Sequence, residues 1–337
     1  MVLMPVFALL LLLAVDIAPS NPDLAYQQPQ IASDGRDVGI VFGARNTIYY
    51  AHNEAPPVTV AEAPVLSLGN HRGPRLAFTA DAIVITAGVG PAGQQYAPNT
   101  LRSWRSTDHG KTWNAGPDIS TPGTGGMGFQ AVGSDGKRRL FAAWIGPQNG
   151  APRLFVAHSD DSGTTWSKQT VLSQTVCECC HPTVTISDDG TVRILFRNSL
   201  DGNRDFYLAT ARDGEHFEIA KLGQGSWKLD ACPMDGGGMG EFDGAVTTLW
   251  RRKSDLFLAT PGEPEEQLAT GHNAAVALRK DGVYAVWSDG ASIMAKVPGK
   301  APYVLSKSGG FPALTARGPV VAAWEDNGRI RTERLGR

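Results

Sequence analysis

The segment CECCH, at residues 177–181, places three cysteines and a histidine within five positions. The chain has one further cysteine, in the segment ACPM at residues 231–234. Thiolate, thioether and imidazole ligands suit copper, above all copper(I), and zinc. If the fold brings the two segments together, we therefore expect a soft-metal site. Its candidate ligands are Cys177, Cys179, Cys180, His181, Cys232 and Met234.

Two other interpretations of the cysteines stay open. An even number of cysteines in an exported protein favours two disulfides, one of them from Cys232, that would brace a binding or assembly scaffold. Two of three closely spaced cysteines would then have to pair with each other, and such short loops are strained. Residues 177–181 also match C-x-x-C-H, the attachment motif of haem c, with Met234 as a sixth ligand. Haem is not expected, because Pro182 and a predicted strand follow at once and leave little room for a covering pocket.

The elements that must position these residues are repeated strands. Seven copies of one apolar strand pattern end at Phe42, Thr86, Trp144, Phe196, Trp250, Trp287 and Trp324. The first and last copies are 282 residues apart, so the six intervals average 47 residues, the period of a four-stranded propeller blade. Most copies follow a tight Asp-Gly type of turn, which is typical of hairpins. The sequence therefore predicts an all-β propeller of four-stranded antiparallel blades, with seven blades favoured and six as the alternative. Residues 22–29 are expected to supply the missing last strand and close the ring.

Alignment of the turns predicts which segments meet. His181 lies nine residues before the turn glycine Gly190, and Asp235 lies nine residues before Gly244 in the next blade. The innermost strands of a propeller surround its axis, so the entrances to these strands crowd around one mouth of the channel. CECCH and ACPM should therefore be neighbours, with Asp235 placed to orient a ligating histidine. Three further residues are expected near this level: His71, His272 and Met239.

Two copies of the motif S-x-D-x-G-x-T-W occur at residues 106–113 and 159–166, with a degenerate copy at 211–217. They resemble the Asp-box of the BNR-repeat propellers of the sialidase-like superfamily, and the chain is similar to a bacterial subgroup with CxCC and ACPM segments. In that family the box is a hairpin between the outer strands of a blade. The resemblance implies structural roles, in which the aspartate accepts backbone N–H bonds and the tryptophan packs between strands. The matching residues are Ser106, Asp108, Gly110, Trp113, Ser159, Asp161, Gly163 and Trp166.

The resemblance makes an exo-sialidase or related glycoside hydrolase the alternative function. The family's mechanism uses three arginines that clamp a carboxylate, a tyrosine nucleophile paired with a glutamate, and an aspartate acid/base. The R-I-P motif of the first arginine is absent, and Arg75 is a weak substitute. Arg197, Arg204 and Asp205 lie in or beside a loop near the cysteines and are candidate substrate-binding residues, although a solvated loop also explains them. If the cysteine site is catalytic instead, copper-dependent redox chemistry is expected.

The amino terminus predicts export. Residues 6–15 form an apolar run of the length of a signal-peptide core, and Ala18 and Ser20 suit signal peptidase. We therefore assign residues 1–20 to a signal peptide and residues 21–337 to one mature domain, periplasmic or secreted and not transmembrane after cleavage. The net charge of −2, with scattered basic residues, gives no reason to expect a nucleic-acid partner. The expected partner is a small ligand, a metal or a glycan, and the oligomeric state stays open.

Overall fold

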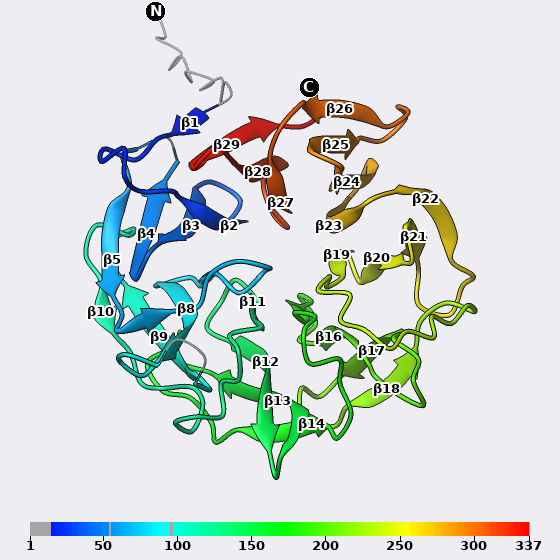
Figure 1. The fold of residues 1–337 in the computed structure, drawn as a ribbon, viewed down its shortest axis with the longest axis horizontal. Helices are drawn as coiled ribbons and strands as arrows, with labels where there is room; N and C mark the ends of the chain where they lie inside the picture. Colours follow the sequence, from blue (N-terminus) through cyan, green and yellow to red (C-terminus); the bar gives the residue numbers. More distant parts are fainter. Residues whose placement is uncertain (1–14, 54, 95–96, 337) are drawn as a thin grey trace, which may run out of the picture.

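Each copy of the repeated pattern forms the second strand of a sheet whose strands follow one another along the chain. In the computed structural model, which describes residues 15–53, 55–94 and 97–336, seven such sheets surround a common axis (Figure 1). The predicted all-β propeller with seven four-stranded antiparallel blades is confirmed, and the six-bladed alternative is wrong. Within the described residues there is no helix that could cross a membrane.

In blades one to four the strands succeed one another from the axis outward. They are β2 (Gln27–Ser33), β3 (Val38–Ala44), β4 (Thr47–His52) and β5 (Val58–Glu62); β7 (Arg75–Phe78), β8 (Ile83–Gly90), β9 (Thr100–Ser106) and β10 (Asn114–Ala115); β11 (Gln130–Ser134), β12 (Leu140–Gln148), β13 (Ala151–Ser159) and β14 (Thr170–Ser173); and β15 (Thr183–Ile186), β16 (Val192–Arg197), β17 (Phe206–Ala211) and β18 (Glu218–Lys221). In blade two a short additional strand, β6 (Val65–Leu66), pairs with the far end of β8.

Blades five to seven repeat this order. Their strands are β19 (Gly238–Phe242), β20 (Ala245–Arg252), β21 (Asp255–Ala259) and β22 (Glu266–Thr270); β23 (His272–Arg279), β24 (Gly282–Asp289), β25 (Ser292–Lys296) and β26 (Tyr303–Ser306); and β27 (Gly310–Leu314), β28 (Val321–Asp326) and β29 (Arg329–Arg334), with β1 (Val15–Ile17) outermost. The outermost strand of blade seven thus comes from the other end of the chain and closes the ring (Figure 1).

The closing strand differs from the predicted one. Residues 22–29 were expected to close the ring, but their last residues belong to β2, the innermost strand of blade one. The closing strand is β1, whose pairing with β29 is supported by an ion pair of 2.9 Å between Asp16 and Arg329 and by burial of Ile17. Of the predicted signal peptide, residues 1–14 lie outside the described residues. Cleavage after Ser20 would remove β1, so the predicted cleavage and this closure cannot both hold in one mature chain.

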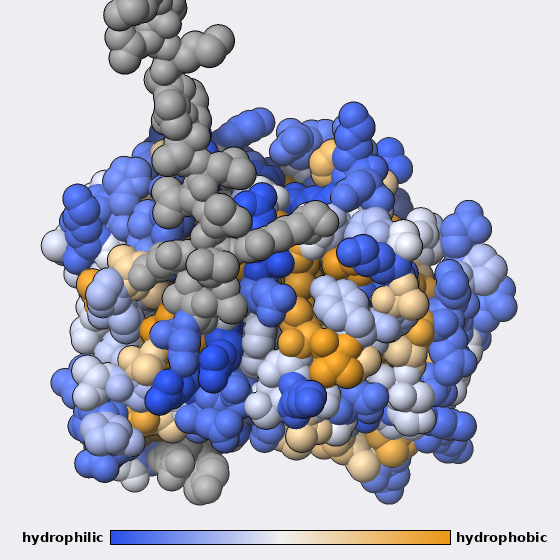
Figure 2. All heavy atoms as spheres, turned by 90° about the horizontal axis from the view of Figure 1, so that it is seen from above, coloured by the Kyte–Doolittle hydropathy of each residue, from blue (hydrophilic) through white to orange (hydrophobic). Residues whose placement is uncertain are grey.

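The core lies between the blades. Every residue of the second strands β3 and β8 is buried, whereas every residue of the outer strand β18 is exposed. A second strand is covered on both faces by neighbouring blades, which explains why its sequence is a continuous apolar run without alternation. Burial of each large side chain there contributes about 1.5–3 kcal/mol. In Figure 2, hydrophilic residues dominate the periphery of the edge shown, and hydrophobic ones appear toward its middle.

The two Asp-boxes are turns between outer strands. In the first box, Gly110 N–H donates to Ser106 Oγ at 2.9 Å, and Ser106 Oγ–H donates to Asp108 Oδ1 at 2.8 Å. Hydrogen bonds from the hydroxyl and backbone N–H of Thr112 hold the pKa of Asp108 below its usual value. The second box repeats this network around Asp161. The Trp113 ring also packs edge-on against Tyr50 of blade one, so the motif joins neighbouring blades.

Candidate functional site

The segment with three cysteines connects β14 to β15 and turns back on itself. Cys177 N–H donates to the carbonyl oxygen of Arg197 at the end of β16, at 2.9 Å, and Cys180 N–H contacts the carbonyl of Cys177 at 3.4 Å. This turn directs the three thiols into the apolar cluster between blades three and four, which also contains Phe129 and Phe196. The cysteines are therefore part of an interblade core, behind the wall of the central channel.

The three thiols form a compact triangle, which we call the thiol cluster (Cys177, Cys179 and Cys180). The Sγ atom of Cys177 lies 3.2 Å from that of Cys180 and 3.7 Å from that of Cys179, and the third distance is 3.9 Å. All three side chains are buried, and no disulfide links them. Among the described residues this is the only group of three or more metal-binding side chains whose ligand atoms lie within 4.8 Å of one another.

The ACPM segment approaches the thiol cluster from blade five, as the turn alignment predicted. Cys232 is exposed, and its Sγ atom contacts Glu178 Oε1 at 3.6 Å. It lies outside the group of three within 4.8 Å. Met234 is 38% exposed and adopts a left-handed backbone conformation. Cys232 is thus a fourth thiol on the solvent side of a buried triangle.

His181 is directed away from the thiol cluster. Its ring stacks on His71 with 4.6 Å between centroids, and it lines the central channel. Its Nδ1 atom is buried beside Gly236 and has no hydrogen-bond partner among the described residues. Burial lowers the pKa of both histidines, so both imidazoles are neutral at pH 7. Phe311 packs edge-on against His71 at 4.9 Å and completes an aromatic constriction of the axis.

Asp235 does not contact a histidine directly. Its Oδ2 atom pairs with Arg251 Nε at 2.7 Å, and its carboxylate accepts the backbone N–H of Asn273. The side-chain oxygen of Asn273 in turn contacts His71 Nε2 at 2.8 Å. The carboxylate therefore orients His71 through Asn273, and His71 is not one of the candidate metal ligands.

Arginine side chains balance the charge around the thiol cluster. Arg204 pairs with Glu178 at 2.9 Å, and its positive charge acts on Cys177. Hydrogen bonds with Cys179 and Cys180, together with the nearby Arg204 guanidinium, lower the pKa of Cys177 to about 3. Burial raises the pKa of Cys180 to about 12, although Arg197 opposes this rise. Cys177 is therefore the first of these thiols to ionise.

The side chains of the three predicted substrate-binding residues all interact with other residues of the protein. Arg197 is 1% exposed, donates to the carbonyl oxygens of Arg204 and Arg251, and lies 4.2 Å from the ring centroid of Phe206. Asp205 is buried and pairs with Lys221 at 3.2 Å. The side chain of Arg204 is 12% exposed and faces Glu178 and Cys177. These residues brace the loop beside the thiol cluster.

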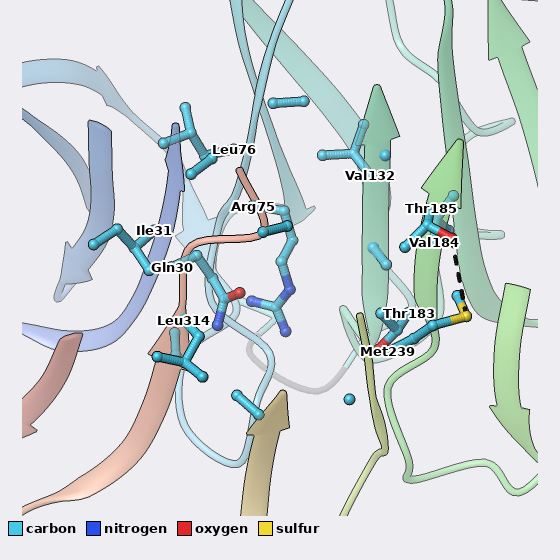
Figure 3. Close-up of a pocket in the computed structure, with 18 of the residues that line it drawn as sticks. Gln30, Ile31, Arg75, Leu76, Val132, Thr183, Val184, Thr185, Met239 and Leu314 are labelled. Carbon is cyan, nitrogen blue, oxygen red and sulfur yellow. Dashed lines mark hydrogen bonds between the residues drawn. The ribbon is translucent and has the colours of Figure 1, made fainter. Parts of the chain in front are cut away.

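A separate cavity of about 300 Å³ follows the propeller axis and is lined by the innermost strands of all seven blades (Figure 3). No tyrosine occurs among the described residues that line it, and its carboxylates are Asp34 and Glu241. Arg75 is its buried cation at the end nearest His71 and His181. The described lining of this channel therefore does not include the three arginines and the tyrosine nucleophile of a sialidase.

Sequence reasoning missed Asn273 and Phe311, which hold His71 from blades six and seven. A glycine shortly before each of these two residues could have identified them from the sequence. Gly271 lies two residues before Asn273 and Gly309 two residues before Phe311, and each glycine packs closely against the tryptophan near the end of the second strand of its blade. Alignment of these glycines would have marked both residues as facing the same end of the axis.

The fold defines a seven-bladed propeller of sialidase-like architecture with an additional interblade thiol cluster. A family model described as the BNR repeat-like domain matches residues 34–226, more than half of the chain. The chain therefore belongs to the BNR repeat-like domain family. No curated protein matches it in sequence.

Solved structures share the fold over almost the whole chain. An α-L-arabinanase of Penicillium chrysogenum has a TM-score of 0.56 at 10% identity, over 96% of this chain and 97% of that one. An α-L-arabinofuranosidase of Fusarium graminearum has a TM-score of 0.53 at 13% identity, covering 95% and 96%. The NanB sialidase of Streptococcus pneumoniae has a TM-score of 0.52 at 8% identity, covering 96% and 92%. Identities this low show a common fold and carry no activity over to this chain.

Proposed function

We propose that the protein binds one soft metal ion, copper(I) or zinc(II), through the thiol cluster, with Cys232 as an additional ligand. The observation that carries the proposal is the triangle of buried sulfur atoms 3.2–3.9 Å apart. With metal–sulfur bonds of about 2.3 Å, two thiolates of a tetrahedral zinc site lie about 3.8 Å apart. Two of the three distances already match this value, so small shifts of the Cys177 side chain would suffice.

The surroundings suit a negatively charged thiolate complex. Zinc with four thiolates, or copper(I) with three, carries a charge of about −2. Arg204 acts electrostatically on Cys177 and Arg197 acts on Cys180, so two guanidinium groups offset negative charge at the cluster. Without the metal, three buried thiols would have little reason to be placed together with two cations in an apolar core.

Copper(I) and zinc(II) differ in whether they need Cys232 as a ligand. Copper(I) is satisfied by three thiolates, whereas a structural zinc site needs four ligands. Cys232 is the remaining cysteine of the chain, and its Sγ atom contacts Glu178, which lies between Cys177 and Cys179 in the sequence. Its exposure also makes it the first sulfur that an incoming ion would meet. If the predicted export holds, the protein is an extracytoplasmic metal-binding propeller.

The test is anaerobic titration of the fully reduced protein with copper(I), buffered by a coloured chelator, and with cobalt(II) as a spectroscopic probe for zinc. We expect one ion per chain and sulfur-to-metal charge-transfer absorption. Cys180→Ser should abolish binding of both ions. Cys232→Ser should weaken cobalt(II) strongly and copper(I) little, because only the tetrahedral site loses a required ligand.

The matched control is Met239→Leu, which removes a sulfur from the channel wall and leaves the thiol cluster intact. Its metal affinity should equal that of the wild type. Failure of the wild type to bind either ion at micromolar concentration, with all four thiols reduced, would refute the proposal. Unchanged binding by folded Cys180→Ser would do the same.

A further inference from the structure

The central channel contains a buried cation without an acidic partner. Arg75 is 6% exposed, and its guanidinium donates to the carbonyl oxygens of Gly73, Pro74 and His71. These bonds use at most three of its five N–H groups. Burial lowers the pKa of Arg75 to about 10, and no described carboxylate offsets that effect. A buried charge is normally paired, so this guanidinium lacks a counter-ion.

The groups around Arg75 do not supply the missing charge. His71 and His181 are imidazoles, which supply no negative charge in either protonation state, and Asp235 is paired with Arg251. Asp34 and Glu241 lie toward the opposite end of the channel, near the turns that follow β2 and β19, and Glu325 accepts the backbone N–H of Gln28. None of the described carboxylates therefore pairs with Arg75. A ligand with a single negative charge would pair with its guanidinium.

The rest of the cavity sets the character of the ligand. Figure 3 shows Arg75 projecting into the channel beside Gln30, with Val132 and Leu314 on its walls. The hydroxyls of Thr183 and Thr185 are directed to Gly237 and Met239, so they are not free to bind a ligand. Arg75 and Gln30 thus supply the polar side chains drawn at this end of the cavity in Figure 3, and the lining beyond them mixes apolar side chains with polar ones such as Ser33, Thr79 and Ser134. A volume of about 300 Å³ is at the lower end for small-molecule sites.

We infer that the channel is a binding site for a small organic monocarboxylate, whose carboxylate pairs with Arg75 and whose remaining part lies along the axis. The inference is independent of the thiol cluster, because Arg75 lies in blade two and the cysteines lie behind the wall of blade four. It assigns no bond-breaking step to the channel. The site differs from an arginine triad for a sugar acid, since the described lining holds one guanidinium at this end, and its second one, Arg317, lies at the opposite end beside Gly136.

The experiment is calorimetric titration of the wild-type protein at pH 7 with acetate, hexanoate and benzoate, each compared with its uncharged amide. At least one carboxylate should bind tenfold or more tightly than its amide, because a hydrogen bond to a charged group contributes about that factor. The same carboxylate should raise the thermal unfolding temperature, and the amide should not. Equal affinities for acid and amide, or no binding by any of the three carboxylates below about 10 mM, would overturn the inference.

A pair of variants locates the site. Arg75→Gln should lose the preference for the carboxylate, whereas Arg317→Gln, which removes a cation from the lining at Gly136, should retain it. A folded Arg75→Gln protein that still prefers the carboxylate would contradict the assignment. If Arg75→Gln does not fold, because three carbonyl oxygens lose their donor, the comparison of acid and amide on the wild type decides alone.

Discussion

The Sγ atoms of Cys177 and Cys180 lie 3.2 Å apart, shorter than the separation in a zinc–thiolate site and longer than a disulfide bond of about 2.05 Å. The distance between the two sulfur atoms of the C-x-x-C turn is therefore intermediate between that of a disulfide and that of two thiolates bound to one metal ion. The fourth sulfur, Cys232 Sγ, lies beside the cluster and contacts Glu178 at 3.6 Å. Oxidation would thus use the same four sulfur atoms that the proposed metal site needs.

The first prediction is that oxidation and metal binding exclude each other. Treatment of the metal-free protein with diamide should remove its free thiols and abolish metal binding, and a reductant should restore both. The metal-loaded protein should keep its thiols for longer, because the sulfur atoms are coordinated. A thiol count and a metal titration on the same sample provide the check. Full metal binding by a sample without free thiols would contradict the account.

The second prediction concerns the pH at which Cys177 ionises. Hydrogen bonds with Cys179 and Cys180 lower its pKa most, and Arg204 adds to this effect. Cys180→Ala should therefore raise the pKa of Cys177 more than Arg204→Gln does, and both should shift thiolate formation to higher pH. The ultraviolet absorbance of the thiolate, followed during a pH titration, measures this order. Arg102→Gln, which breaks a surface ion pair with Asp118, is the control and should leave the titration unchanged.

The third prediction concerns the Asp-box glycine. A Cβ atom at Gly110 would lie 2.1 Å from the Tyr50 ring, and the backbone φ of Gly110 is +80°. Gly110→Ala should destabilise the protein by about 2–5 kcal/mol, from left-handed strain and overpacking together. Gly123 has the same φ of +80° but no atom within 4 Å of such a Cβ. Gly123→Ala should therefore cost only about 1–2 kcal/mol, the strain alone. Denaturant unfolding measures both, and equal costs would refute the interblade role of Gly110.

The fourth prediction is that a fluorogenic sialoside is not hydrolysed. None of the described channel-lining residues is a tyrosine, and Arg197 is buried under Phe206 and bound to backbone carbonyls. Among the described residues, the channel therefore holds no tyrosine nucleophile and no clamp of three arginines. Release of the fluorophore by the wild type, lost on Arg75→Gln, would restore the glycoside hydrolase alternative.

The fold could be predicted because its signal is repeated. A second strand such as β3 is buried on both faces, and the apolar run that this requires recurs in every blade. The closing strand could not be predicted in the same way. The three residues of β1 carry no pattern of their own, and their pairing with β29 depends on where the ring brings the two ends of the chain.

The site was predicted at the level of segments but not of side-chain directions. Turn alignment brought CECCH beside ACPM, and the contact of 3.6 Å between Cys232 and Glu178 bears this out. The turn alignment could not show that Cys180 faces the interblade core while the next residue, His181, faces the channel. Turn residues have no fixed period, so neighbours in sequence can be directed to different compartments. The pairing of Asp235 with Arg251 likewise depends on a residue of the next strand.

The most direct test of the central claim is X-ray absorption at the metal edge of the protein loaded with one equivalent of copper(I) or zinc(II). The account predicts a first shell of three or four sulfur atoms at about 2.3 Å, with three for copper and four for zinc. Cys180→Ser should lose that shell. A first shell made only of nitrogen and oxygen would show that the metal binds elsewhere and that the buried thiols are not its ligands.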